Sequence, residues 1–530
     1  MIFPPAVKGF IGKHVSKALL ADLLFCCSPL LVFLLVICVL GVNPFRWVPF
    51  WNDEVGWYMQ VNSVIEHGMP PGYTGYNETH AAVGRFGPWG GFLVCVMALF
   101  GKIFGWHWYS PLFMNVFFWV LANTVFCFFT RPDWRTAVKL TALNFASFVS
   151  IHYMFTGYSE ITRFSMSIIL AGLFFFLLKD ENRGSRKYFV VLSAIAPVLL
   201  FLFVNCYLMF AFLLPVYGYI WYKHLNPQRC RFLSFVALCV ILPTLFALVC
   251  LFIQVKTSVP YPNNTLVSYL QQPNAVSFFK MLKKIVAENY ERANLGYIFR
   301  NAKRMNGCIS SYLMVYYLIL GIVLVQLVVV LKRSRKLNPL ILLAVYAMTS
   351  FIFAFLVLDS TRFPWTYVRG LNVAFVFSLY LLCMLDWPRL HCVLFGLMFM
   401  QFFQFTIYVR GDMVARYAAR NGCRSGHESF EKYSRVFHSK LVPVETEDPW
   451  DNTVALYGGI YNFYCAISPG LSWNYILDGH PVTKPRYVVT DRLRDWDFAG
   501  YEKTYSDDFV NIFEKVARRL STVKETGGTK

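Results

Sequence analysis

The sequence predicts a polytopic α-helical membrane protein with a small soluble domain at its C-terminal end. Hydrophobic residues make up 57% of the 530-residue chain and charged residues 15%, and the mean hydropathy is +0.48. Apolar runs long enough to cross a bilayer recur up to about residue 409. The composition then becomes polar, with strand-like runs at Thr453–Tyr457 and Arg486–Thr490. We therefore expect a transmembrane domain over residues 1–409 and a soluble α/β or α+β domain over residues 410–530.

About eleven apolar segments have the length and composition of membrane spans. The first of them, Ala21 to Gly41, is longer than the core of a signal peptide, so we interpret it as a retained span. The spans are expected near residues 20–41, 109–129, 138–155, 164–178, 188–204, 206–222, 232–253, 310–331, 339–358, 370–385 and 391–409.

Lysine and arginine residues between these runs set the expected orientation. With eleven spans and a cytoplasmic N-terminus, the basic clusters near residues 8–17, 131–139, 179–187, 223–231 and 332–336 all fall on the cytoplasmic side. The outer side then receives the loops 42–108 and 254–309, two short turns and the C-terminal domain. The 254–309 loop is itself basic, which counts against this orientation, although long loops follow the charge rule weakly.

Residues 87–105 are apolar enough to be a further span. Counting them as one would place several basic clusters outside, so we expect an amphipathic or re-entrant helix on the outer face. Helices are also expected within residues 275–305 and, in the soluble domain, near 412–420, 428–437 and 508–520.

Charge and cysteine content exclude several function classes. The net charge of +20 does not indicate a nucleic-acid partner, because the basic residues lie between spans. Most of the 14 cysteines lie inside apolar runs and no CxxC pair occurs, so neither a zinc nor a redox motif is present. Pairing of Cys423 with Cys465 in the polar tail stays open. The tail contains neither a GxGxxG nor a GxxxxGK[ST] motif.

The unusual polar residues gather on the predicted outer side. Acidic side chains beside a membrane span are energetically costly, so their presence suggests a function. The pair Asp53–Glu54 follows the first span, and Glu160 with Arg163 occupies the turn between the third and fourth spans. The remaining candidates, from the first outer loop and the turn before the tenth span, are Tyr58, His67, His80, Arg85, Arg362, Tyr367 and Arg369.

Each of these residues also has a structural explanation that needs no substrate. Asn52 could cap a helix, with Asp53 and Glu54 at the positive end of its dipole. Glu160 and Arg163 could form an ion pair at i, i+3. An exposed loop charge would explain Arg362, and lipid headgroups could attract Arg369. The histidines could be ordinary loop residues, and the aromatic runs at 104–119 could form an interfacial belt.

The first outer loop carries a family resemblance. The run Asn52-Asp53-Glu54, Tyr58 and Glu66-His67-Gly68-Met69-Pro70 resembles that of GT-C glycosyltransferases, including protein O-mannosyltransferases and lipid A aminoarabinose transferases. The position of Glu160 is similar to that of the second acidic motif of this superfamily. The turn from Arg362 to Arg369 is similar to its late arginine-containing turn. A soluble C-terminal domain is also common there.

The resemblance implies transfer of a sugar from a polyprenyl-phosphate carrier to a glycan, lipid or protein acceptor, with inversion. One carboxylate suffices as the general base, and we expect Asp53 to take that role. Arginines suit the departing phosphate, and the candidates are Arg85, Arg163, Arg362 and Arg369. Neighbouring helical residues point about 100° apart, so Glu54 would instead orient the acceptor or hold an arginine.

Several roles stay open at this stage. Glu160 could support the base, bind acceptor hydroxyls or help to ligate a metal. The sequence requires no cofactor and contains no tight metal-ligand spacing, which leaves a divalent metal as an option. Tyr58, His67 and Tyr367 are expected to contact other parts of the substrate.

Two other functions fit the same sequence less well. A polysaccharide polymerase or ligase would use the basic 254–309 loop. A flippase or transporter would need polar residues at mid-membrane, whereas the acids here gather at one face. The expected location is a bacterial inner membrane. The active site and the C-terminal domain would lie outside the cytoplasm, and membrane lipids would surround the spans.

Overall fold

The computed structural model describes most of the membrane domain and the strands of the C-terminal domain. The described residues are 17–41, 43–47, 49, 52–68, 86–87, 90–226, 229–258, 307–334, 338–358, 364–387, 391–399, 453–457, 472–476, 486–491, 498–507 and 510–516, with the single residues 279, 283, 287 and 402. Outside them lie the expected helices at 412–420 and 428–437, nearly all of 275–305, and both Cys423 and Cys465.

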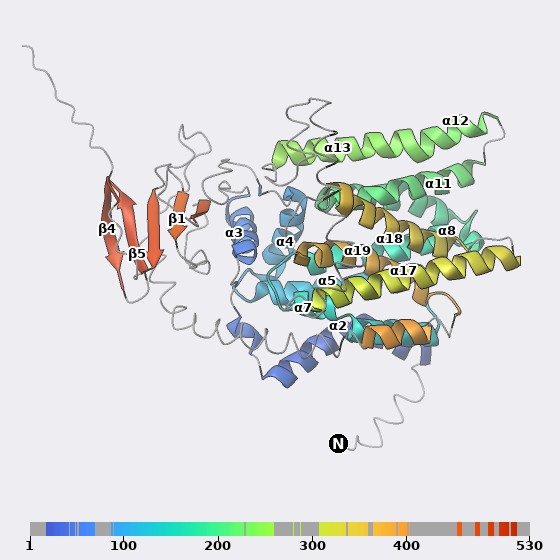
Figure 1. Cartoon of the computed structure of the whole chain (residues 1–530), viewed down its shortest axis with the longest axis horizontal. Coiled ribbons are helices and arrows are strands. Elements are labelled where there is room, and N and C mark those ends of the chain that lie inside the picture. The colour runs from blue at the N-terminus through green and yellow to red at the C-terminus, as the bar shows by residue number, and fades with distance from the viewer. Residues whose placement is uncertain are drawn as a thin grey trace, which may run out of the picture.

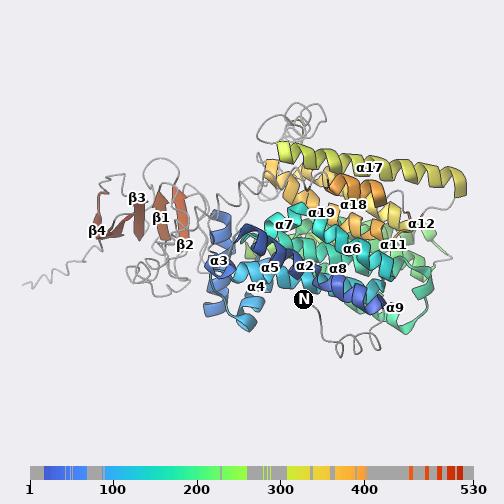
Figure 2. The ribbon, with the colours of Figure 1, turned by 90° about the horizontal axis from the view of Figure 1, so that it is seen from below.

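The membrane domain is a bundle of long helices (Figures 1 and 2). In chain order the described helical elements are α2 (Lys17–Leu40), η1 (Pro44–Arg46), α3 (Asn52–His67), α4 (Gly91–Phe104), α5 (Ser110–Thr130), α6 (Trp134–Ala146), α7 (Phe148–Met154), α8 (Glu160–Leu178), η2 (Asp180–Asn182), α9 (Arg186–Val190), η3 (Val191–Ile195), α10 (Ala196–Cys206), η4 (Leu208–Leu213), α11 (Leu214–Leu225), α12 (Arg231–Val236), η5 (Ala237–Ile241), α13 (Leu242–Thr257), α17 (Gly307–Ser334), α18 (Pro339–Leu358) and α19 (Pro364–Cys383).

Six helical stretches of the described residues are long and apolar enough to cross a membrane. They are α2, α5, α8, the continuous run from α9 to α10, the run from α12 to α13, and α17. Shorter apolar helices, among them most of α18 and α19, lie beside them. The chain is therefore a multi-pass integral membrane protein.

Two of the expected spans are interrupted. The 138–155 segment is divided into α6 and α7 at Ser147, whose backbone (φ −79°, ψ 73°) leaves the helical region. The 206–222 segment starts with the 3₁₀ turn η4, and α11 begins only at Leu214.

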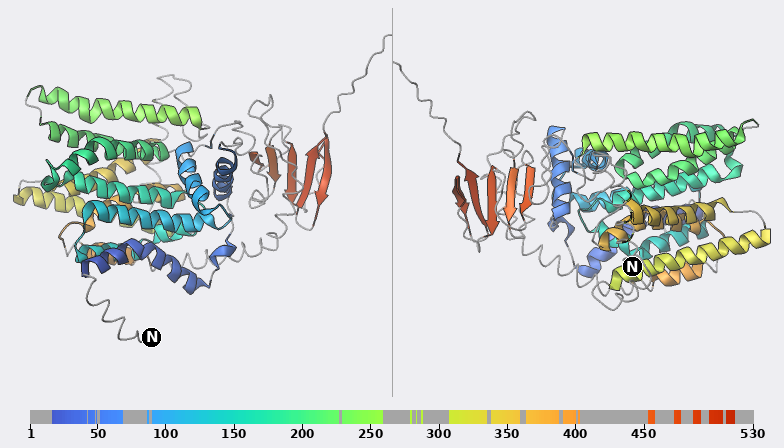
Figure 3. Two further views of the ribbon diagram at one scale, coloured as in Figure 1. Left: turned by 180° about the vertical axis from the view of Figure 1, so that it is seen from behind. Right: turned by 45° about the horizontal axis from the view of Figure 1, so that its top comes forward.

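The segment expected on the outer face forms the 14-residue helix α4. Figures 1 and 3 show α3 and α4 running across the direction of the long helices, at one end of the bundle. This agrees with a surface or re-entrant helix and not with an additional long span.

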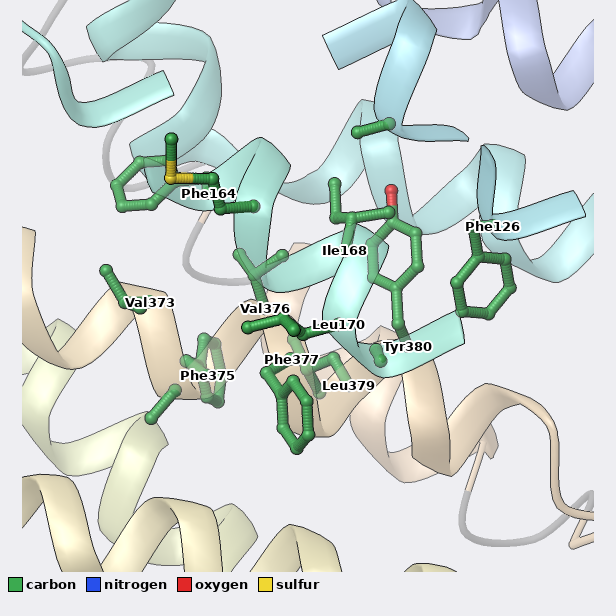
Figure 4. Packing of buried hydrophobic residues seen from close by; sticks show 14 of the residues in the cluster. Phe126, Phe164, Ile168, Leu170, Val373, Phe375, Val376, Phe377, Leu379 and Tyr380 are labelled. Carbon is green, nitrogen blue, oxygen red and sulfur yellow. The ribbon is translucent and has the colours of Figure 1, made fainter. Parts of the chain in front are cut away.

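Helix α8 lies at the centre of the bundle against α5 and α19. Figure 4 shows Phe164, Ile168 and Leu170 of α8 facing the apolar side chains of α19. Gly172 permits the close approach of α5, because a Cβ there would lie 3.1 Å from Cα of Phe126. This packing fixes the start of α8 relative to α19.

A proline in α2 is compensated by a buried polar network. Pro29 has no N–H for the carbonyl of Phe25, four residues earlier. Oγ of Ser28 and Nδ2 of Asn123 donate to that carbonyl at 2.7 Å and 3.1 Å. The hydroxyl of Tyr380 connects α19 to the same network. Inside a membrane such internal bonds replace water.

Two further prolines follow wide helical turns, and α11 lies against both. Pro197 cannot donate to the carbonyl of Leu192, which instead accepts from the hydroxyl of Tyr217 at 2.6 Å. Pro243 likewise leaves the carbonyl of Leu238 free, and Gly218 packs directly against it. Any side chain at position 218 would collide with that backbone, so α11 fits only with glycine there.

The described residues of the C-terminal domain form a five-stranded mixed sheet. Its strands are β1 (Thr453–Tyr457), β2 (Ser472–Ile476), β3 (Tyr487–Asp491), β4 (Tyr501–Ser506) and β5 (Val510–Lys515), in the order β2-β1-β3-β5-β4. β1 pairs in parallel with β2 and β3, and β5 pairs antiparallel with β3 and β4. In Figures 1 and 3 the sheet lies beyond α3, at the end of the bundle that carries the acidic residues.

Two strand predictions in this domain are confirmed, and one helix prediction is wrong. Strands occur at 453–457 and 487–491, as expected. The expected helix at 508–520 is strand β5 over its described part. The polar Asn511 stands between the apolar Val510 and Ile512. The ring of Phe513 packs on that of Phe498, with the ring centres 5.2 Å apart. Pairing on both sides, with β3 and β4, overrides the local helical pattern.

Candidate functional site

The acidic pair occupies the first turn of α3, at the end of the bundle where α8 and α19 begin. The side chain of Asp53 is 29% exposed, whereas Glu54 is fully buried. The two carboxylates point in different directions, as expected for neighbours on a helix. They also have different partners.

Glu54 connects α3 to the turn before α8. Its Oε1 accepts a hydrogen bond from the backbone N–H of Gly157 at 3.1 Å. That turn is held from the other side by Asn115 of α5, whose Nδ2 donates to the carbonyl of Thr156 at 2.9 Å. Glu54 therefore positions α3, which differs from a direct contact with the acceptor.

Glu160 is the first residue of α8 and lies between two guanidinium groups. Its Oε1 is 3.4 Å from Nη1 of Arg369 and 3.7 Å from Nη1 of Arg163. Only 4% of the Glu160 side chain is exposed. The i, i+3 ion pair that the sequence permits is thus present, and Arg369 extends it across the bundle. Oε2 of Glu160 has no hydrogen-bond partner among the described residues.

Arg369 joins three helices. Helix α19 begins at Pro364 and not near 370, since proline is well suited to the first turn of a helix. Arg369 therefore lies on the helix itself. Its Nη1 is 3.9 Å from Oδ2 of Asp53, and its guanidinium carbon is 5.4 Å from the ring centre of Tyr158. The side chain remains 25% exposed.

The surroundings of Asp53 make its carboxylate more basic. Burial raises the pKa of Asp53 above its ordinary value, and the negative charges of Glu160 and Glu54 act in the same direction. The positive charges of Arg369 and Arg163 oppose this shift. A carboxylate with a raised pKa is a better general base near neutral pH.

Other candidates from the sequence are not part of this cluster or cannot be placed. The ring of Tyr58 stacks between Trp106 (5.6 Å) and Trp108 (5.7 Å), so it anchors α3 to the segment after α4. Four further candidates are not described at the level of side chains: Arg85, Arg362, His67 and Tyr367. His80 is outside the described residues as well. Among the residues that are described, no group of three or more His, Cys, Asp or Glu could hold a metal ion.

Three residues at the site were not singled out by the sequence. Gly157 and Tyr158 belong to the turn before α8, and their adjacency to Glu160 was the available signal. Tyr207 comes from the end of α10 and lies under Arg163 at 4.8 Å. Nothing in the local sequence around Tyr207 distinguishes it from other aromatic residues at a helix end.

Comparison with solved structures finds a distant similarity. No protein-family model matches the chain, and no curated protein matches it. The crystal structure of the Archaeoglobus fulgidus oligosaccharyltransferase in the apo form is similar, with a TM-score of 0.41 and 13% sequence identity. The match covers 87% of this chain and 64% of the archaeal chain, so this chain spans less than two thirds of that protein's length. We therefore take the function from the chemistry of the site.

The cluster combines one partly exposed carboxylate with two cations held by a buried carboxylate. Asp53 is the acidic side chain that solvent and substrate reach most easily, since Glu54 and Glu160 are buried. Such a site can remove a proton from one group while it stabilises an anion beside it.

Proposed function

We propose that the protein is an integral-membrane glycosyltransferase that moves a sugar from a polyprenyl-phosphate carrier to an acceptor. The observation that carries this proposal is the contact of Arg369 with both Asp53 and Glu160. It places a cation suited to phosphate beside a carboxylate suited to accept a proton. Transfer from a lipid phosphate needs both groups at a membrane face.

The chemistry follows from the positions of these groups. Asp53 takes the proton from the acceptor hydroxyl or amide as that atom bonds to the anomeric carbon. The bond between the anomeric carbon and the phosphate oxygen breaks on the opposite face, which inverts the centre. The bonding electrons leave with the phosphate, and Arg369 and Arg163 stabilise its charge. A phosphate leaves as a stable anion, so this step requires no general acid.

Charge explains why Arg369 can serve the donor. In the cluster its guanidinium is shared between two carboxylates at 3.4 Å and 3.9 Å, distances that are longer than an optimal charge-assisted hydrogen bond. A phosphate offers oxygens at closer range in the plane of the guanidinium. Binding of the donor would draw Arg369 away from Asp53 and free the base.

The distribution of basic residues supports an extracytoplasmic site, and the membrane we propose is a bacterial inner membrane. The charge rule, applied to the basic clusters between spans, favours an outer position for the start of α8 and of α19, together with α3. The acceptor would bind beside Asp53. A glycan, a lipid or a protein could present the accepting group there.

A donor panel tests this function. The purified full-length protein in nanodiscs would be incubated with polyprenyl-phosphate sugars, with and without a membrane extract that supplies acceptors. We expect release of polyprenyl phosphate that depends on the acceptor. Absence of release with every polyprenyl-phosphate sugar, in a preparation that stays folded and monodisperse, would exclude the proposed class of donor.

A further inference from the structure

Each arginine of the cluster lies against the face of a tyrosine. The guanidinium carbon of Arg369 is 5.4 Å from the ring centre of Tyr158, and that of Arg163 is 4.8 Å from the ring centre of Tyr207. Both distances are within the range of a cation–π interaction, about 6 Å. Both guanidinium groups also contact the same carboxylate oxygen, Oε1 of Glu160.

Tyr158 is held firmly by its turn. Its backbone N–H donates to Oγ1 of Thr156 at 3.4 Å, and its ring meets that of Tyr153 edge to face at 6.0 Å. The adjacent Gly157 is bonded to Glu54. The ring under Arg369 therefore belongs to a segment anchored on both α3 and α5.

Tyr207 is held by a different part of the chain. It has extended backbone angles (φ −154°, ψ 105°) between α10 and η4, and its N–H donates to the carbonyl of Phe203 at 2.8 Å. Nε2 of Gln254 on α13 donates to the last carbonyls of α10, those of Val204 (3.2 Å) and Asn205 (3.0 Å). Helix α13 thereby supports the ring under Arg163.

This arrangement leaves hydrogen-bonding edges of the arginines available. A tyrosine face contacts the flat side of a guanidinium and does not use its N–H groups. Nε of Arg163, although buried, has no hydrogen-bond partner among the described residues, so no protein acceptor there competes for this N–H. Nη1 of each arginine lies within 3.7 Å of the same Glu160 oxygen. The two guanidinium groups are therefore close enough to each other for a single phosphate group to contact both.

We propose that Tyr158 and Tyr207 are positioning residues that hold Arg369 and Arg163 as a prearranged pair for the phosphate of the lipid-linked donor. This inference rests on the proposed function and deepens it. The aromatic face, and not the hydroxyl, does the positioning. Loss of the ring should weaken donor binding, whereas loss of the hydroxyl alone should not.

Binding can be measured separately from catalysis. A fluorescent short-chain polyprenyl phosphate would be titrated into full-length Asp53→Asn protein in nanodiscs, with the matching polyprenol as the phosphate-free control. The series adds Tyr158→Phe, Tyr158→Leu, Tyr207→Phe and Tyr207→Leu to that background. Leucine should weaken phosphate binding about 2- to 30-fold, the range of a cation–π contact. Phenylalanine should stay within about 2-fold of the parent, and polyprenol binding should not change.

The outcomes separate the inference from the function. Leucine variants that bind as tightly as the parent, or phenylalanine variants that lose as much as leucine variants, would overturn the positioning role while leaving the glycosyltransferase proposal intact. A parent protein with no preference for the phosphate over the polyprenol would overturn both. Where a leucine variant fails to fold, Tyr→Met at the same position replaces it, since methionine fills similar space without a ring.

Discussion

The turn before α8 offers a sharp test, because it allows one methyl group to be added beside the acidic end of α3. In Gly157→Ala the new Cβ would lie 3.0 Å from Cη2 of Trp47 and 3.2 Å from Cβ of Glu54. The backbone of Gly157 is outside the left-handed region, so alanine itself is tolerated there. The perturbation is therefore steric.

The distances give the size of the effect. Ordinary contacts between carbon atoms are about 3.5–4.0 Å, so Trp47 and Glu54 must each retreat by roughly 0.3–1 Å. Overpacking of this kind costs about 1–3 kcal/mol of stability. Glu54 and Asp53 share the first turn of α3, so Asp53 moves with Glu54 relative to Arg369. A displacement approaching 1 Å can lower activity about 100-fold, and we expect kcat/KM to fall by about 10- to 100-fold.

The assay compares Gly157→Ala with a glycine that has free space around it. Gly321 of α17 has no heavy atom within 4 Å of an added Cβ, so Gly321→Ala is the matched control. Acceptor-dependent release of polyprenyl phosphate and thermal unfolding in detergent would be measured for both. Gly321→Ala should match the wild type in release and be at least as stable, because alanine favours a helix more than glycine does. Wild-type kcat/KM in Gly157→Ala would refute the role of this turn in positioning Asp53.

Two further predictions concern the cation and the core. In Arg369→Gln we expect kcat/KM to fall about 100- to 1,000-fold. The acid limb of the pH–rate profile should move to higher pH, because Asp53 acts in its ionised form and loss of the positive charge raises the pKa of Asp53 further. A profile with an unshifted acid limb would contradict the pairing of Arg369 with Asp53. In Tyr380→Phe, the side-chain oxygens of Asn123 and Asn144 lose a hydroxyl that lies 2.9 Å and 2.6 Å away. This should reduce stability by about 1–3 kcal/mol in thermal unfolding with kcat per folded molecule unchanged, and an unchanged unfolding temperature would show that the network is dispensable.

The sequence was most informative where charge and topology act together. Asp53, Glu160 and Arg369 are separated by more than a hundred residues from one to the next, yet the distribution of lysine and arginine assigned them to one face. The structure brings them into contact. The identity of their local partners was harder to predict, because Glu54 bonds a backbone N–H at Gly157, and a backbone group has no signature in the sequence.

The remaining differences arise from contacts that are distant in the chain. Tyr207 reaches Arg163 because α13 supports the end of α10, through bonds between residues about 50 positions apart. The break at Ser147 involves neither proline nor glycine, and Asn144 just before it is held by hydrogen bonds with Ser28 of α2 and Tyr380 of α19. Strand β5 is selected by its two neighbours in the sheet and not by local propensity.

We propose Asp53 as the base of a transfer from a lipid-linked donor. The most direct measurement is single-turnover release of polyprenyl phosphate by the wild type and by Asp53→Asn, with the same donor and acceptor. Asparagine has nearly the same shape but cannot accept the proton, so we expect the rate to fall about 100- to 10,000-fold while the donor still binds. Release by Asp53→Asn at a rate within a few-fold of the wild type would show that Asp53 is not the base.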